Sequence, residues 1–174
     1  MKRGGPLKRH TPLRSYTQLR SNTKLRARAQ NETNDVKDEI QELCRQIAIL
    51  RDGGCIFRNF RERMPFEYLE CGPRRKDGEL VLQFDHLNSR RHSVSYGEPR
   101  LGICACKRHH FYFKKDHPML YMEIVRDQIG NDRWYLLERV MQSNHKATRF
   151  FTADWLKLKA GLQQELRNLQ KNHA

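Results

Sequence analysis

Two short groups of residues carry side chains that can bind a metal ion and move a proton. The first is Asp85-His86, which follows an apolar alternation ending at Phe84, and the second is a Cys-x-x-His-His run at 106–110. Asp85 and His110 offer ligands for one divalent cation, Mg²⁺ or Mn²⁺, whose open positions would take a phosphate and a water. His86 can act as general base because a neutral imidazole is available near pH 7. We therefore predict a catalytic site for phosphodiester hydrolysis built from these three residues.

A second metal site, with a structural role, is expected beside the first. A small motif buries little apolar surface, and a zinc ion can supply the missing stability. Tetrahedral zinc takes four thiolate or imidazole ligands, and the four expected here are Cys55, Cys71, Cys106 and His109. Cys104 is an alternative to Cys106 as the third zinc ligand. Only Cys106 is separated from His109 by two residues, the Cys-x-x-His spacing of a zinc knuckle, and we call 106–109 the knuckle. The first two cysteines are separated by far more than the usual two to four residues.

The composition favours a polyanionic partner. The chain of 174 residues has a formal net charge of +14, a pI of about 9.9 and a mean hydropathy of -0.90. Because each Lys or Arg set against a phosphate releases condensed counterions, DNA is the expected partner, and charge used only for solubility is the alternative. No run of about 18 apolar residues could span a bilayer, and the five cysteines are too few and uneven for a secreted disulfide framework. We expect a cytoplasmic protein with one compact domain plus appendages and no membrane partner.

Residues 1–33 are expected to form a disordered, extended basic arm. A period of six residues runs through 6–26 and fits neither a helix nor a one-sided strand, and two prolines oppose a helix. The cations of this arm, among them Arg9, Arg14 and Arg20, would lie along a phosphate backbone and add affinity without reading bases. The alternative is a solvated tail with no specific role.

The rest of the chain, 34–174, predicts an α+β domain whose elements hold the two sites. A helix over 34–52 ends at Gly53-Gly54. The core over 53–117 has a strand at 80–84, a polar loop at 87–100, a segment at 101–106 that leads into the knuckle, and a helix from Phe111, which is a ββα order. Helices follow over 118–174, with a stop at Gly130 and a last helix from Thr152. The apolar stripe of this last helix is short, which favours packing on the domain over packing on a second copy.

Cations on both sides of the predicted site would contact the DNA backbone. The loop at 87–100 is long enough to lie over a phosphodiester, and the knuckle adds two further cations. The expected contact residues of the domain are Arg90, Arg91, Arg100, Lys107 and Arg108.

Each residue of the predicted site also has a plainer interpretation. In that case Asp85 only caps a turn, and His86 is a half-buried imidazole whose hydrogen bonds are satisfied within the fold. The pair His109-His110 would then belong to a basic patch that binds phosphate.

Taken together, these motifs resemble the HNH (ββα-metal) nucleases, and among them the phage NinG/Rap recombination endonuclease family. The resemblance covers roughly 35–169: the helix before the first cysteine, a His followed by Ser89-Arg90, the knuckle, the Gly130 turn and the last helix. It implies an endonuclease that acts on branched recombination intermediates such as Holliday junctions or D-loops. It also implies a base at His86, catalytic ligands at Asp85 and His110, and the zinc set given above. The sequence departs from the family in its widely split first cysteine pair and in His109 where a Cys is common.

Two other functions remain open from the sequence. The first is a less selective HNH nickase or double-strand nuclease with the same active site. The second is a non-catalytic DNA-binding accessory protein whose fold is stabilised by zinc and which brings recombination proteins to DNA. A homodimer would suit paired cuts in a junction, because two symmetric strands need two sites.

Overall fold

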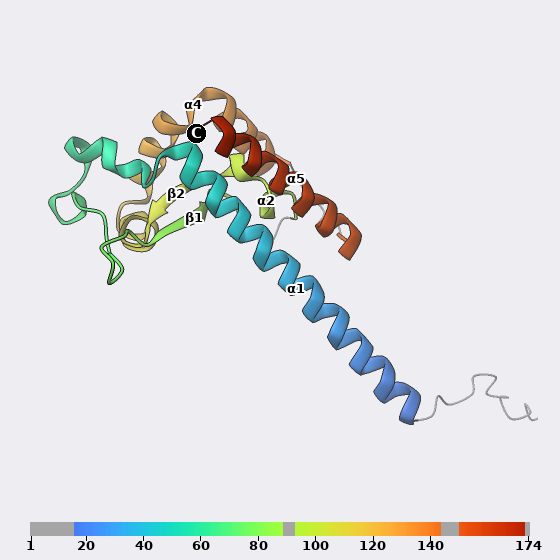
Figure 1. Ribbon diagram of the computed structural model, residues 1–174. Coiled ribbons are helices and arrows are strands. Elements are labelled where there is room, and N and C mark those ends of the chain that lie inside the picture. Colours follow the sequence, from blue (N-terminus) through green and yellow to red (C-terminus); the bar gives the residue numbers. More distant parts are fainter. Residues whose placement is uncertain (1–15, 89–92, 144–149, 173–174) are drawn as a thin grey trace, which may run out of the picture. The chain divides into compact units, whose positions relative to one another are not determined.

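The computed structural model describes residues 16–88, 93–143 and 150–172, and the chain divides into two compact units, 1–35 and 36–174. In chain order the elements are α1 (Tyr16–Asp52), the 3-10 helices η1 (Ile56–Arg63) and η2 (Phe66–Tyr68), strand β1 (Leu82–His86), α2 (Ser93–Tyr96), the 3-10 helix η3 (Pro99–Leu101), strand β2 (Gly102–Cys106), the π-helix η4 (Arg108–Phe113), α3 (Lys114–Asp116), α4 (Pro118–Gln142) and α5 (Thr152–Asn172). Figure 1 shows this mixture of helices with one small sheet, which makes the second unit an α+β structure as predicted.

The first unit contains the beginning of a long helix, not an extended arm. Helix α1 starts at Tyr16, so the prediction of an extended conformation was wrong for 16–33, and so was a helix start at 34. Arg28 pairs with Glu32 one turn later, and the Thr33 hydroxyl donates to the Ala29 carbonyl. Helix formers such as Leu, Arg, Lys, Ala and Gln dominate this stretch, and their intrinsic preference outweighs the six-residue repeat. The part of the predicted arm at 1–15 lies outside the described residues.

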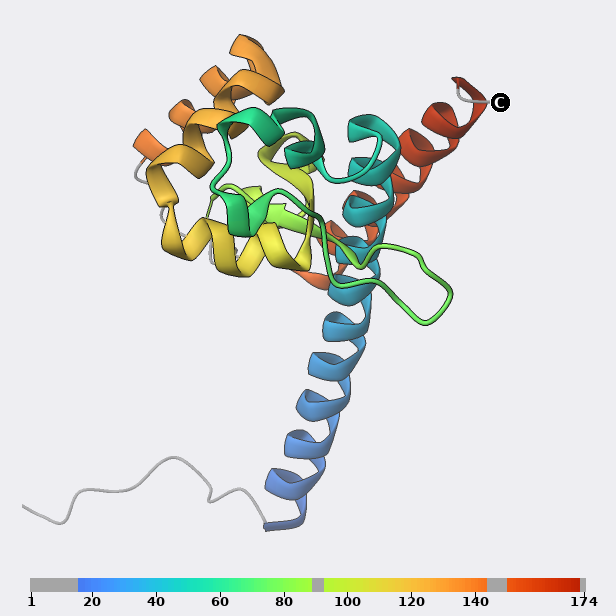
Figure 2. The ribbon, with the colours of Figure 1, turned by 90° about the vertical axis from the view of Figure 1, so that its left-hand side faces the viewer.

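In the second unit, the last five turns of α1 carry a buried stripe against α5. Ile40, Cys44 and Ile47 are buried in one cluster with apolar residues of α5, of which Trp155 is the largest. The two segments lie side by side in Figures 1 and 2, so the stripe of the last helix packs within the chain, as the sequence predicts. Gly53, with a φ of 67°, ends α1 in a left-handed conformation that favours glycine.

The two strands form an antiparallel pair directly before a helical segment. Asp85 lies opposite Ile103 and His86 opposite Gly102, and every residue of β2 is buried. Strand β1 lies two residues later than the predicted 80–84, because the chain first makes a loop closed by a bridge from Arg74 to Leu80. This loop protrudes from the second unit in Figure 2. The helix after β2 begins at Arg108 rather than Phe111 and opens with a π-helical turn.

A second core lies between the strands, η1 and α4. The ring of Phe57 meets that of Phe113 edge-on, with centroids 5.6 Å apart, and that of Tyr121 at a tilt, with centroids 4.7 Å apart. Helix α4 is broken at Gly130, whose φ of 75° interrupts the helix where a stop is predicted. Within the described parts of the chain, no helix is both long and apolar enough to cross a membrane.

Candidate functional site: a Cys3His group and an adjoining cleft

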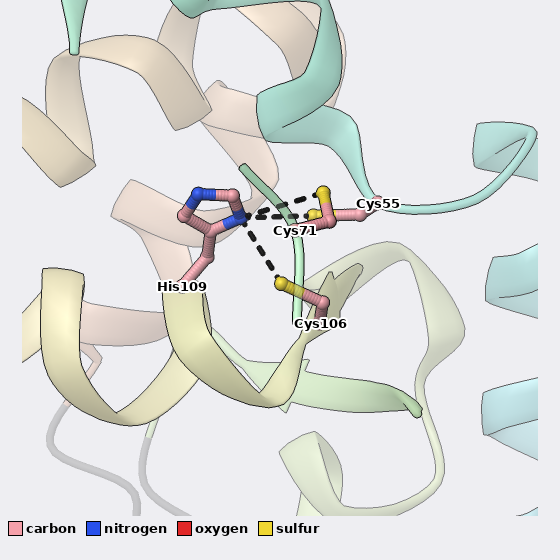
Figure 3. Close-up of side chains that lie close together, drawn as sticks. All are labelled: Cys55, Cys71, Cys106 and His109. Atoms are coloured by element: carbon pink, nitrogen blue, oxygen red, sulfur yellow. Dashed lines mark hydrogen bonds between the residues drawn. The ribbon is translucent and has the colours of Figure 1, made fainter. Parts of the chain in front are cut away.

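Four residues from three separate segments bring their ligand atoms together (Figure 3). Cys55 follows α1, Cys71 lies in the loop after η2, Cys106 ends β2, and His109 lies in the turn that follows. Their ligand atoms all lie within 4.8 Å of one another. Nδ1 of His109 is 3.3, 3.9 and 3.2 Å from the sulfurs of Cys55, Cys71 and Cys106. Neighbouring sulfur and nitrogen ligands of a tetrahedral zinc ion lie about 3.6 Å apart, so this group can hold a metal ion such as zinc.

The surroundings of His109 fix the nitrogen that it offers. Its Nε2 donates a hydrogen bond of 2.8 Å to the carbonyl oxygen of Tyr68, which leaves the Nδ1 lone pair directed at the three sulfurs. A hydrogen bond of this kind on the far ring nitrogen is typical of histidines that bind metals. Hydrogen bonds from the Cys55 and Cys71 thiols lower the pKa of Cys106, which favours its thiolate form. The ring of His109 is fully buried beside Phe57.

Cys104 and Cys44 lie outside this group. The backbone N–H of Cys104 donates to the Asp52 carboxylate, and burial raises the pKa of the Cys104 thiol to about 12. Burial likewise raises the pKa of Cys44 to about 12 within the α1–α5 cluster. The group thus contains the four predicted residues, and Cys106 rather than Cys104 is its third thiol.

A cleft of about 570 Å³ is lined by all three predicted catalytic residues, Asp85, His86 and His110, the last of which directly follows His109 of the Cys3His group. Asp85 is buried, whereas His86 and His110 are half-buried. The cleft wall also carries side chains from α1 and from the helical segment after β2. The structure therefore brings the three residues to one cavity, although strand alternation sends Asp85 and His86 to opposite faces of β1.

Asp85 is held by three side chains. Lys114 Nζ lies 2.7 Å and 2.9 Å from its two oxygens, the Tyr121 hydroxyl donates to Oδ2, and His110 Nε2 lies 3.1 Å from Oδ1. Burial by itself raises the pKa of Asp85, but the hydrogen bond with His110 and the charge of Lys114 hold it below its ordinary value. The carboxylate is therefore kept ionised in a buried place.

The orientation of His110 suits a metal ligand. Its Nδ1 donates to Gln83 Oε1 over 2.9 Å, and its Nε2 faces Asp85 Oδ1. Without a metal ion, a proton on Nε2 joins these two atoms as the hydrogen bond described above, and a bound cation would take the place of that proton. Adjacent ligands of an octahedral Mg²⁺ ion bound at about 2.1 Å lie about 3.0 Å apart, close to the 3.1 Å between these two atoms. The same distance is that of an ordinary N–H···O hydrogen bond, so Asp85 and His110 could be joined either by a proton or by a small divalent ion.

His86 is anchored to α1. Its Nε2 lies 2.6 Å from Gln41 Oε1, and the amide nitrogen of Gln41 donates to the Tyr96 carbonyl. The second bond fixes the amide, so Nε2 of His86 carries the proton and Nδ1 carries the lone pair. Nδ1 is buried, and the ring packs edge-on against Phe84 at 4.6 Å.

The predicted DNA contacts are partly outside the described structure. This holds for Arg9, Arg14, Arg90 and Arg91, and for the side chain of Arg20 in α1. Arg100 is exposed but paired with Glu98 at 2.8 Å, beside α5 rather than the cleft. Lys107 and Arg108 are both exposed in the knuckle.

Four residues around the cleft were missed by the sequence reasoning: Lys114, Tyr121, Gln41 and Gln83. The sequence could have predicted that Lys114 lies near His110, because a residue four positions later lies on the same face of a helix. The sequence could likewise have predicted that Gln83 lies on the same face as Asp85, because it precedes Asp85 by two residues on a strand. Gln41 and Tyr121 approach from distant helices, and no local pattern marks them.

No family model matches the chain, and no match is found among the curated proteins or among the solved structures.

Proposed function

We propose that this protein is a metal-dependent DNA endonuclease of the HNH (ββα-metal) class. The observation that carries the proposal is the meeting of Asp85 and His110 at 3.1 Å in a cleft that His86 also lines. His110 directly follows His109, so a structural zinc ion would fix the position of the catalytic ligand. Two antiparallel strands followed by a helical segment support the same class.

Asp85 and His110 would hold a Mg²⁺ or Mn²⁺ ion. Such an ion supplies charge that polarises the scissile phosphate and stabilises the leaving oxygen. The side chains of the cleft have separate tasks. Gln83 sets the tautomer of His110, and Tyr121 holds Oδ2 of Asp85. The Lys114 ammonium, about a third exposed, can turn from the carboxylate to a phosphate oxygen.

His86 is the proposed general base, and its proton-accepting atom is Nδ1. Gln41 keeps the proton on Nε2 and holds the ring at the edge of the cleft. Because Nδ1 is buried, accepting a proton from water requires the ring to give up its bond to Gln41 and turn toward the cleft when the substrate binds. Phe84 and Tyr96 flank the ring and limit that rotation.

The proposed substrate is DNA, with branched recombination intermediates as the preferred form. The formal charge of +14 supports a polyphosphate partner, and the exposed Lys107 and Arg108 lie next to the zinc ligands. Junction preference rests on the resemblance to the NinG/Rap family alone. A less selective HNH nuclease would have the same cleft.

One observation favours a different function. Both oxygens of Asp85 already accept hydrogen bonds from Lys114 or Tyr121. This arrangement would suit a non-catalytic DNA-binding protein whose fold is stabilised by zinc. In such a protein the lysine would serve only to neutralise the buried carboxylate.

A cleavage assay separates these functions. The zinc-loaded protein is incubated with Mg²⁺ or Mn²⁺ and a four-way junction, a flap or linear duplex, beside His86→Ala and the control His117→Ala. We expect the wild type and His117→Ala to cut, and His86→Ala to lose at least a hundredfold in rate with zinc content and DNA binding unchanged. Equal rates on all substrates would support the less selective nuclease. Tight, salt-sensitive binding without cleavage under either ion would contradict a nuclease.

A further inference from the structure

One wall of the cleft carries an exposed aromatic ring next to the proposed catalytic ligand. Phe111 is 49% exposed, and its ring stacks on His110 with centroids 4.4 Å apart and planes 20° apart. His110 in turn faces Asp85. About half of the Phe111 surface, 49%, is therefore exposed beside the place where a phosphodiester would be cut.

A packing role does not account for this exposure. The run Phe111-Tyr112-Phe113 lies in the π-helix η4, and only Phe113 enters the core. Tyr112 is 55% exposed and is absent from the described lining of the cleft, whereas Phe111 belongs to it. A π-helical turn is frequent at functional sites. Here it turns one aromatic ring into the core and a second one to the cleft.

We propose that Phe111 is a stacking platform for an unpaired nucleobase beside the scissile phosphate. This inference rests on the proposed function and names a residue that selects the substrate. Aromatic side chains stack on bases of any identity, but only where the face of the base is free. In an intact duplex both faces of each base are covered by its neighbours. A flap or gap presents such a base, so Phe111 would favour these substrates over linear duplex.

The rest of the cleft fits a nucleotide. Its volume of about 570 Å³ lies within the range of small-molecule sites. Its wall carries the cations of Lys114 and Arg45, which are paired with Asp85 and Glu42, and the carboxylate of Asp38. Asn88 and Gln41 contribute polar groups.

Fluorescence of 2-aminopurine tests the inference apart from cleavage. The probe is placed as the unpaired base of a gapped duplex, and the zinc-loaded protein is titrated without Mg²⁺ or Mn²⁺. Phe111→Leu keeps an apolar contact with His110 but removes the aromatic face, Phe111→Trp keeps that face, and Tyr112→Leu is the matched control outside the cleft. We expect the wild type, Phe111→Trp and Tyr112→Leu to quench the probe. Phe111→Leu should lose the quenching and bind the gapped DNA about tenfold more weakly, with unchanged binding to linear duplex.

The outcomes separate this inference from the nuclease proposal. Cleavage by wild type with equal quenching by Phe111→Leu would overturn only the stacking role. An equal loss of affinity for duplex and gapped DNA in Phe111→Leu would also overturn it. Quenching that depends on Phe111 in a protein that never cuts would support the stacking site while the hydrolytic function fails. Absence of any DNA binding would overturn both.

Discussion

At the scale of single residues, the two candidate metal sites differ in the charge that already surrounds their ligands. The Cys3His group packs among apolar rings, and Arg58 and Arg74 line surface pockets together with Cys55 and Cys71. Asp85, by contrast, has the Lys114 ammonium within hydrogen-bonding distance. A metal ion that binds Asp85 must therefore share the carboxylate with Lys114 or displace it.

This competition gives a prediction for Lys114→Met. The change removes the cation of a buried carboxylate, so the melting temperature without divalent ions should fall, by about 5 °C or more. Mn²⁺ should then raise the melting temperature of Lys114→Met by more than that of the wild type, because the ion can take the place of the ammonium. Differential scanning fluorimetry with and without Mn²⁺ measures both effects.

Lys115→Met is the matched control, since Lys115 is exposed on the same helix and is outside the described wall of the cleft. It should behave as the wild type does. A Lys114→Met protein whose stability does not respond to Mn²⁺ would argue against Asp85 and His110 as metal ligands.

At the scale of elements, the strand pair sets the positions of Asp85 and His86. Gly102 pairs with His86 across the sheet, and its missing side chain leaves room for the Phe84 ring. A Cβ at Gly102 would overlap that ring and lie 2.9 Å from the carbonyl oxygen of Asp85. The two strands can therefore approach closely only with glycine at this position.

Gly102→Ala should lower the free energy of unfolding by roughly 1–3 kcal/mol, because the added methyl group displaces Phe84 and the strand beside it. Gly161→Ala is the control: a Cβ there meets no atom within 4 Å, in the interior of α5. It should raise the free energy of unfolding by about 0.5–1 kcal/mol through helix preference. Urea unfolding of both variants gives the comparison, and a Gly102→Ala protein as stable as the wild type would contradict the packing argument.

At the scale of the whole molecule, the Cys3His group ties together segments that are distant in the sequence. Cys55, Cys71 and Cys106 come from the end of α1, a long loop and β2, and the short 3-10 helices between them bury few side chains of their own. A bound zinc ion would link these segments into one cooperative unit.

Removal of zinc should therefore unfold the core around Phe57 and Phe113. We expect a strong chelator to lower the melting temperature by more than about 10 °C or to abolish the cooperative transition. Thiol titration of the native protein should show slow reaction before chelation and at least three more reactive thiols afterwards, since three cysteines belong to the group. Cys106→Ala should mimic the chelator, whereas Cys104→Ala should keep its zinc; equal zinc content in both would contradict the ligand set.

Part of this architecture follows from local patterns. The knuckle spacing selects Cys106 and His109, and the three- and four-residue spacing of Ile40, Cys44 and Ile47 predicts the buried stripe of α1. Gly130 marks the break in α4 because a backbone with positive φ favours glycine. The helix over 16–33 was not foreseen, because its apolar residues lack helical periodicity although its residues prefer helix.

The sequence by itself determined the residue types of the site and their order along the chain: an acid-histidine pair, a knuckle and a cationic composition. Only the tertiary structure decided that Lys114 and Tyr121 hold Asp85, and that Gln41 orients His86. The physical reason is that these contacts join distant segments, and their geometry is set by the packing of α1, β1 and α4 rather than by any local preference.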